Sequence, residues 1–273
     1  LVIHLPHQFL VKNLHLLKEK PPGGGVFLCG WRPYCTTGCL TTLLALIMIL
    51  SVAVSWLWYA AWNNGNINND RRETALASIM QRAREISDDT AHALNMSTET
   101  DADTLTAVIW QHTKAPTITY DESRLKFTAT TAESAIYDEQ VLLPGGGPVK
   151  VSRCLVFTYT RHPGTAWTPQ VAEKNDEACH PGTDISALVR LTQTHLSTLH
   201  AQDLTRAAVQ HSLDPTGNLQ SYDVKNVVHT GDTVTISILV SSPGTTVGQC
   251  YRFIRPAHNN SQSPTTVTAT PSC

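Results

Sequence analysis

The chain lacks the short motifs that mark the most common catalytic and nucleotide-binding sites. It has no GxSxG nucleophile elbow, no P-loop, no GxGxxG fingerprint and no HExxH helix. These absences remove the usual sequence evidence for a serine hydrolase, a phosphate-binding loop, a dinucleotide fold and a zinc peptidase. We therefore assign no catalytic residue, no cofactor and no metal site, and we expect that the protein is not an enzyme.

Charged residues are scarce and unevenly distributed. They make up 15% of the 273 residues, and the formal net charge is −2. Residues 1–39 carry a balance of +3, so the remaining residues together carry −5. A mildly acidic surface offers little to the phosphates of a nucleic acid, and we expect no nucleic-acid partner.

The longest stretch without charge is also the most apolar. No Asp, Glu, Lys or Arg occurs at residues 33–69, and residues 40–62 form a nearly continuous apolar run of 23 residues. A helix of that length spans roughly 34 Å, enough to cross a hydrocarbon core of about 30 Å. Three tryptophans and a tyrosine gather at its end, where amphipathic rings sit at headgroup level. We predict a transmembrane helix over residues 40–62, with the lipid bilayer as its partner.

The flanking charges predict the orientation of this helix. Residues 1–39 are basic, whereas the charges at residues 70–73 cancel. The positive-inside rule then makes residues 1–39 a cytoplasmic tail and places residues from 63 onward outside the cell membrane, in a single-pass protein. A cleaved signal peptide is the alternative, because Ala60 and Ala61 precede Trp62, although the run exceeds the usual length of about 7–15 residues.

The region after the span is predicted to begin with helices and to continue with strands. Residues 63–69 are expected to form a polar hinge, and Asp70 to cap an amphipathic helix. The apolar residues of that helix recur at helical spacing: Leu76, Ile79, Met80, Ala83, Ile86 and Leu94. A short helix is predicted over residues 105–112. The β-rich runs that follow lie at residues 117–120, 125–130, 134–143 and 149–160.

The same order of elements then occurs a second time. Asp184 is expected to cap a helix with apolar residues at Ile185, Leu188, Val189, Leu196 and Leu199. A short helix is predicted over residues 204–211. Further β-rich runs lie at residues 218–229, 233–241 and 247–255.

Short sequence matches support a duplication. Gln111-His112 aligns with Gln210-His211, and the segment that begins at Cys154 aligns with the one that begins at Cys250. We predict an α+β fold in which the transmembrane helix is followed by two tandem helix-plus-antiparallel-sheet modules. Their boundaries are residues 63–181 and 182–273.

Four cysteines lie in the predicted exported part, and the duplication selects one of their three possible pairings. Only Cys154–Cys179 together with Cys250–Cys273 treats the two modules alike. A bridge over a loop of this length contributes roughly 3 kcal/mol in the chain-entropy model. The alternative is a metal site that contains Cys179-His180, but no second such pair accompanies it.

Histidines and carboxylates do not form a recognisable constellation. His112 and His211 recur at the ends of short predicted helices, where a positive charge is favoured, and we interpret them as capping residues. The carboxylates are expected to be solvated surface groups: Asp121, Glu122, Asp138, Glu139, Glu173, Asp176 and Glu177.

The chain resembles uncharacterised single-pass membrane proteins of actinobacteria. The resemblance rests on the Arg- and Ala-rich segment at residues 71–85, the Cys-Tyr-Arg-Phe strand at residues 250–253 and the terminal Pro-Ser-Cys at residues 271–273. It implies an anchored, exported, disulfide-containing α+β protein and implies no activity, because the group has none assigned. The membrane-anchored scaffold proteins of type IV secretion are similar at the level of fold, since they also place a helix-plus-curved-sheet domain after one span.

Two classes of function follow from these features. The first is a non-enzymatic interaction or envelope and secretion scaffold, which presents helix faces or strand edges to an envelope protein. The second is an exported ligand-binding or hydrolytic domain with a pocket between helix and sheet. A filled interface between helix and sheet would count against the second class. The sequence identifies neither the partner nor the oligomeric state.

Overall fold

The computed structural model describes residues 34–141, 146–200, 203–217, 220–257 and 264–273, with side chains from residue 40 onward. The chain divides into two units, Leu1–Trp58 and Tyr59–Cys273. Most of the predicted cytoplasmic tail therefore lies outside the described residues.

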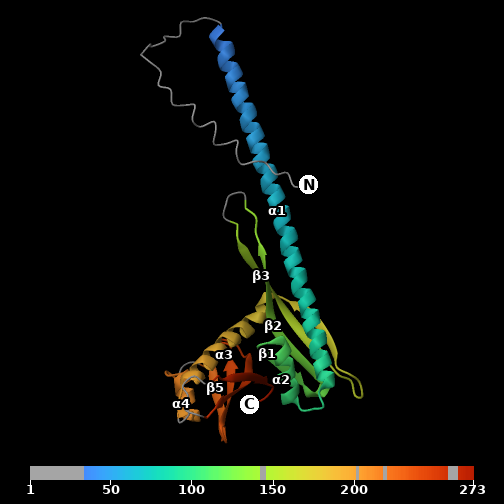
Figure 1. The fold of residues 1–273 in the computed structure, drawn as a ribbon, viewed down its shortest axis with the longest axis vertical. Helices are drawn as coiled ribbons and strands as arrows, with labels where there is room; N and C mark the ends of the chain where they lie inside the picture. The colour runs from blue at the N-terminus through green and yellow to red at the C-terminus, as the bar shows by residue number, and fades with distance from the viewer. Residues whose placement is uncertain (1–33, 142–145, 201–202, 218–219, 258–263) are drawn as a thin grey trace. The chain divides into compact units, whose positions relative to one another are not determined.

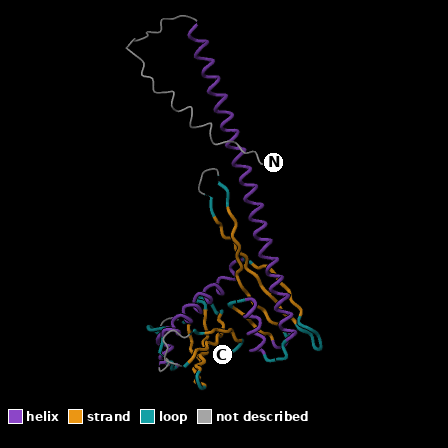
Figure 2. Tube along the Cα trace, in the orientation of Figure 1, coloured by secondary structure: helices purple, strands orange, loops and turns teal. Residues whose placement is uncertain are grey.

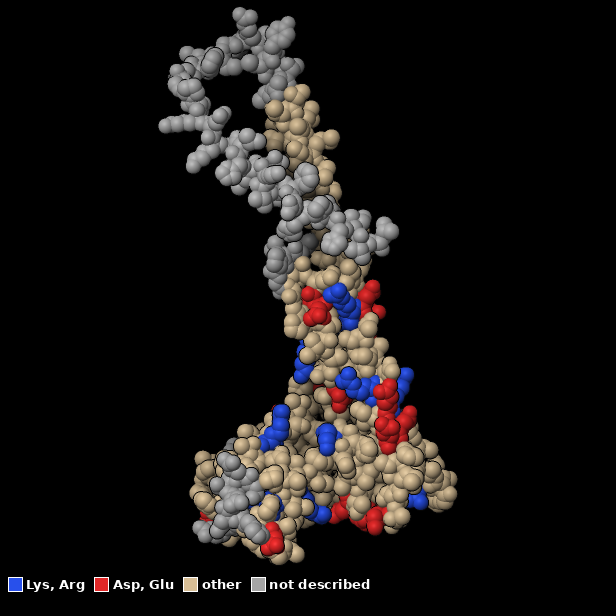
Figure 3. All heavy atoms as spheres, in the orientation of Figure 1, with Lys and Arg blue, Asp and Glu red and all other residues tan. Residues whose placement is uncertain are grey.

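Helix α1, Tyr34–Met96, contains the predicted span (Figure 1). The apolar side chains of this part are exposed, for example Leu50 at 62% and Trp58 at 79%. In Figure 3 the visible atoms at the start of the helix include no charged side chain. Within the described residues, α1 is the one helix that is long and apolar enough to cross a membrane. Because so much apolar surface is unfavourable in water, this helix suggests membrane anchoring.

The predicted hinge at residues 63–69 is wrong, because α1 is helical throughout this stretch. Asp70 lies inside the helix, where its carbonyl accepts a hydrogen bond from the Thr74 hydroxyl at 2.8 Å. Asparagine in a helix costs less than about 1 kcal/mol relative to alanine, so tertiary contacts can outweigh its low propensity. Asn68 provides such contacts. Its amide donates to the carbonyl oxygen of Gln140 and accepts from the backbone N–H of Gln140, both at 2.8 Å.

The predicted amphipathic face of α1 is confirmed. Ile79, Ala83 and Leu94 expose 2% or less, and the partly buried residues Leu76, Met80 and Ile86 pack against the same core. Helix α2, Ala102–Thr113, follows after a break. Its N-cap is Asp101, whose carboxylate accepts from the backbone N–H of Thr104 at 2.9 Å. Hydrogen bonding to the side chain of Thr104, and then to its backbone N–H, lowers the pKa of Asp101, because both bonds favour the charged form.

The first sheet is antiparallel with the order β1-β2-β3-β4. Its strands are β1 Thr117–Asp121, β2 Lys126–Asp138, β3 Pro148–Thr160 and β4 Thr168–Lys174, with the 3-10 helix η1 Glu122–Arg124 between the first two. Strands β2 and β3 pair from Lys126–Thr160 to Asp138–Pro148 and extend beyond both neighbours as a two-stranded hairpin (Figure 2). The two runs predicted at residues 125–130 and 134–143 are therefore parts of one strand. The end of this hairpin lies against α1, because Arg71 donates to the carbonyl of Asp138 at 2.7 Å.

The second helix pair precedes the second sheet. After the 3-10 helix η2, Asp176–Cys179, come α3, His180–Thr198, and α4, Arg206–Leu213. Helix α3 begins before Asp184, so the predicted Asp184 cap is wrong. Pro181 occupies its first turn, where the missing N–H costs nothing. The boundary expected between residues 181 and 182 thus falls inside this turn.

The second sheet repeats the antiparallel order, β5-β6-β7-β8. Its strands are β5 Tyr222–Thr230, β6 Thr233–Ser241, β7 Gly248–Pro256 and β8 Thr266–Thr270. Arg255 of β7 is 1% exposed and donates to the carbonyls of Leu196 and Leu199 at the end of α3. A guanidinium at this place satisfies carbonyls that the helix leaves without partners.

The last strand of each sheet, β4 and β8, is missing from the sequence prediction. Pro169 in β4 and the short length of β8, five residues, weaken the pattern of each. Both are edge strands, where proline is tolerated.

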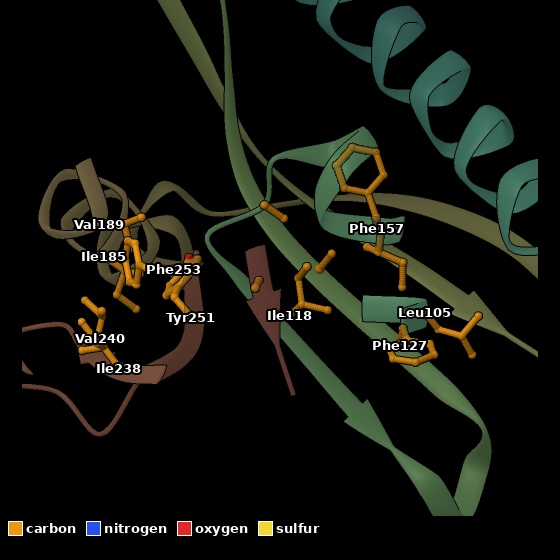
Figure 4. Packing of buried hydrophobic residues seen from close by; sticks show 14 of the residues in the cluster. Leu105, Ile118, Phe127, Phe157, Ile185, Val189, Ile238, Val240, Tyr251 and Phe253 are labelled. Carbon is orange, nitrogen blue, oxygen red and sulfur yellow. The ribbon is translucent and has the colours of Figure 1, made fainter. Parts of the chain in front are cut away.

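The buried side chains of both sheets belong to one contiguous cluster. Figure 4 shows two groups of labelled residues within it. One group, with Phe127 and Phe157, lies on the first sheet, and the other, with Ile238 and Phe253, lies on the second. The two sheets therefore share a core within the unit Tyr59–Cys273.

Candidate binding groove at the junction of the two sheets

Gln249 of β7 joins the two sheets through its side-chain amide. The oxygen accepts from the backbone N–H of Ile118 in β1 at 2.7 Å, and the nitrogen donates to the carbonyl of Thr270 in β8 at 2.6 Å. Gln249 is 4% exposed, so these bonds are shielded from water. The edge of β1 is thus covered by a side chain of the other sheet, which blocks strand addition there.

Pro116, between α2 and β1, is the second point of contact. The Tyr251 hydroxyl donates to its carbonyl at 2.6 Å. Burial raises the pKa of Tyr251 well above its ordinary value, because the phenolate would lose its hydration. Gly182 of α3 lies so close that an added Cβ would stand 2.9 Å from Cγ of the Pro116 ring. A glycine is required there for α3 to approach this connection.

A groove lies at the junction, with a volume of about 670 Å³. One side is formed by α2 and the residues after it, the other by α3, β7 and β8. The lining residues are Trp110, Lys114, Pro116, Ser186, Val189, Arg190, Gln193, Tyr251, Thr265, Thr266 and Val267. Volumes of this order are typical of small-ligand sites.

Two cations line the groove, and no carboxylate does. Lys114 is the C-cap of α2, in the left-handed conformation with φ of 51°, and its backbone N–H donates to the Trp110 carbonyl at 2.9 Å. Its ammonium lies 4.4 Å from the centre of the Trp110 ring, within the range of a cation–π interaction. Arg190 is an exposed residue of α3.

Gln193 and Thr265 form the polar part of the lining. The Gln193 amide donates to the Thr265 carbonyl at 2.5 Å. Thr265 is 5% exposed, yet its hydroxyl has no hydrogen-bond partner. A buried hydroxyl without a hydrogen-bond partner is unfavourable.

The four cysteines that follow the predicted span pair as the sequence predicts. The structure joins Cys154 to Cys179 and Cys250 to Cys273, with Cα–Cα distances of 5.6 and 5.5 Å. His180 lies beside the first bridge in a small depression of about 200 Å³. Across the described residues, no group of three or more His, Cys, Asp or Glu side chains could hold a metal ion.

The structure leaves the predicted charged residues apart. His112 and His211 lie in the last turns of α2 and α4, as expected. Glu173 forms an ion pair with Arg153, and Asp121 accepts from the backbone N–H of Arg124 at 3.2 Å at the start of η1. Asp138, Glu139, Asp176 and Glu177 are exposed.

The groove residues were not predicted from the sequence. Trp110, Arg190 and Thr265 are far apart along the chain, and each is ordinary in its own element. When the chain is compared with protein-family models, with curated proteins and with solved structures, none of the three comparisons finds a match.

Proposed function

We propose that the protein is a membrane-anchored, extracytoplasmic interaction module without catalytic activity. In this proposal residues 1–39 face the cytoplasm, and two tandem α+β modules on the other side contact an envelope protein. The type IV secretion scaffolds are an analogy at the level of fold only. The proposed relationship to actinobacterial single-pass proteins is consistent with this role and adds no activity.

Repeated structural details support a tandem duplication. Each sheet follows a longer and a shorter helical segment, and each third strand carries a cysteine bonded to one beyond the fourth strand. In the first half the Asn95 amide bonds the backbone of Trp167, just before β4. In the second half Gln193 bonds Thr265, just before β8. Both pairs are 72 residues apart in the chain.

The observation that carries the non-enzymatic proposal is the filled space between the helices and the first sheet. Ile79 and Leu94 of α1, Ile109 of α2, and Phe127 and Phe157 of the sheet each expose 2% or less. Side chains packed to this degree leave no room for a substrate between helix and sheet.

The alternative, an exported ligand-binding or hydrolytic domain, draws support in its ligand-binding form from the junction groove. This groove lies between the two halves and not beneath a helix within one half. Its lining has a polar and an apolar part but contains no nucleophile–base pair that would favour hydrolysis.

Photocrosslinking in intact cells tests the interaction role. A photoreactive amino acid would replace Ile136 on the β2–β3 hairpin, 70% exposed, or Val228 on β5, 43% exposed, in the full-length protein. The membrane fraction would then be solubilised, and crosslinked partners would be identified by mass spectrometry. The same span fused to an unrelated exported domain is the control.

The proposal predicts a reproducible envelope partner that is lost with the control fusion and when residues 63–273 are deleted. Recovery of the protein without a crosslinked partner from either position, or an identical set of proteins with the control, would contradict it.

A further inference from the structure

We propose that the junction groove binds an organic anion, that is, a carboxylate or phosphate group attached to an apolar or aromatic body. This inference goes beyond the interaction role and does not depend on it. It rests on the charge of the lining, on its aromatic wall and on one unsatisfied buried hydroxyl.

The charge of the lining is entirely positive. Lys114 and Arg190 are its ionisable cations, and no Asp or Glu belongs to the lining. Nearby Arg252 differs, because Asp103 neutralises it at 3.0 Å. Within the part of the chain that the structure describes, no carboxylate forms an ion pair with Arg190. An uncompensated guanidinium presents a planar fork that matches a carboxylate or a phosphate.

The apolar part of the lining favours an anion that carries an apolar body over an inorganic ion. Trp110 provides an aromatic surface whose face is already next to the Lys114 ammonium. Val189 and Val267 add aliphatic surface. Tyr251 is 1% exposed and its hydroxyl is bonded to Pro116, so it supports the groove from below and offers little surface to a ligand. An inorganic anion would leave these surfaces unused, whereas an organic anion would cover them.

The Thr265 hydroxyl supplies evidence that is independent of charge. It lies in a residue that lines the groove and is 5% exposed, and it has no partner. The Gln193 amide is bonded to the Thr265 carbonyl and not to this hydroxyl. Because the hydroxyl oxygen itself is buried, a ligand oxygen would give it a hydrogen-bond partner only after the Thr265 side chain rotates toward the groove.

Titration calorimetry of the purified full-length protein in detergent tests the inference. The probes are phenyl phosphate and benzoate, compared with neutral benzamide and with inorganic phosphate. We expect measurable binding of both aromatic anions, at least tenfold weaker binding of benzamide and weaker binding of inorganic phosphate. Equal affinity for benzoate and benzamide would overturn the proposal, as would the absence of binding by both aromatic anions.

Matched variants locate the site. Arg190→Gln should weaken phenyl phosphate binding by about tenfold or more, since it removes a charge-assisted contact. Arg84→Gln, the same change at an exposed position of α1, should leave binding unchanged. Equal effects of the two changes would show that the anion binds elsewhere.

Thr265→Val separates a ligand contact from a structural role. Without ligand, the change removes an unsatisfied hydroxyl and should raise the midpoint of thermal unfolding or leave it unchanged. With ligand, it should weaken binding several-fold. A variant that keeps its fold and binds phenyl phosphate with unchanged affinity would contradict the role of this hydroxyl.

Discussion

At the scale of single residues, the contact between the two sheets depends on a few buried polar side chains. Gln249 satisfies an edge N–H of one sheet and a carbonyl of the other, while Tyr251 bonds the carbonyl of Pro116. Each of these two side chains forms at least one hydrogen bond to a backbone group that is more than 100 residues away in the sequence. The spacing of residues in the sequence predicts which side chains are neighbours within one helix or strand. It does not predict contacts between elements that are far apart in the sequence, so neither contact could be predicted, although Tyr251 lies in a recognisable strand.

The first prediction concerns Gln249. Gln249→Ala leaves the Ile118 N–H without its partner at a buried edge, which should lower the free energy of unfolding by about 1–3 kcal/mol. Denaturant unfolding of the full-length protein in detergent measures the loss. Gln170→Ala on β4, an exposed position, is the control and should change it by less than about 0.5 kcal/mol. Equal small effects would mean that Gln249 does not join the sheets.

The second prediction concerns two buried phenols, Tyr159 and Tyr251, and the half-buried Tyr222. Burial raises the pKa values of Tyr159, Tyr222 and Tyr251. In the unfolded chain a phenol titrates near pH 10, so above this pH the unfolded state releases protons that the folded state keeps. The contribution to stability is complete below about pH 10 and is lost as the pH rises further, by up to about 1.4 kcal/mol per pH unit for each fully buried phenol.

The variant Tyr251→Phe isolates one of these phenols. It should cost about 1 kcal/mol at neutral pH, through the lost bond to Pro116, and should make the decline above pH 10 shallower. Unfolding free energies measured from pH 8 to 11.5 provide the comparison. An alkaline decline that is as steep in the variant as in the wild type would contradict the assignment.

At the scale of elements, pattern reasoning worked where a periodic apolar face meets a core. The predicted residues Ile79 and Ala83 of α1, and Ile185 and Val189 of α3, are buried, and the predicted β-rich runs fall on the central strands. The pattern missed the buried polar residues Ser87 and Thr192 on the same helices. It failed at residues 63–69, because an Asn-rich segment has low helix propensity and its stabilising bonds come from the β2–β3 hairpin. It also failed for β4 and β8, which are short edge strands held partly by helix side chains that pair just before them.

The third prediction tests the two disulfides as equivalent elements. Replacing both cysteines by alanine, either Cys154 with Cys179 or Cys250 with Cys273, should cost about 3 kcal/mol, because each bridge closes a loop of similar length, 25 or 23 residues. Denaturant unfolding without reductant measures both double variants. A double variant as stable as the wild type would show that its bridge does not form in the purified protein.

At the scale of the whole molecule, the groove arises from assembly and not from any one element. Its lining comes from α2, α3, β7 and β8, which are brought together only when the two halves share a core. The sequence could therefore predict the long apolar helix, the central strands of both sheets and the cysteine pairing, but not the surface where the two sheets meet. The proposed membrane anchoring and export are inferred from sequence patterns. The proposed ligand binding is inferred from the folded junction between the two sheets.

The central claim is that residues 63–273 form one disulfide-bonded body on the oxidising side of the membrane. The most direct test is to block free thiols with an alkylating reagent in intact cells and during lysis, and then to map cysteine-linked peptides of the full-length protein by mass spectrometry. We predict that Cys154 is recovered linked to Cys179, and Cys250 to Cys273, without alkylation. Recovery of these four cysteines as alkylated thiols, or in another pairing, would contradict it.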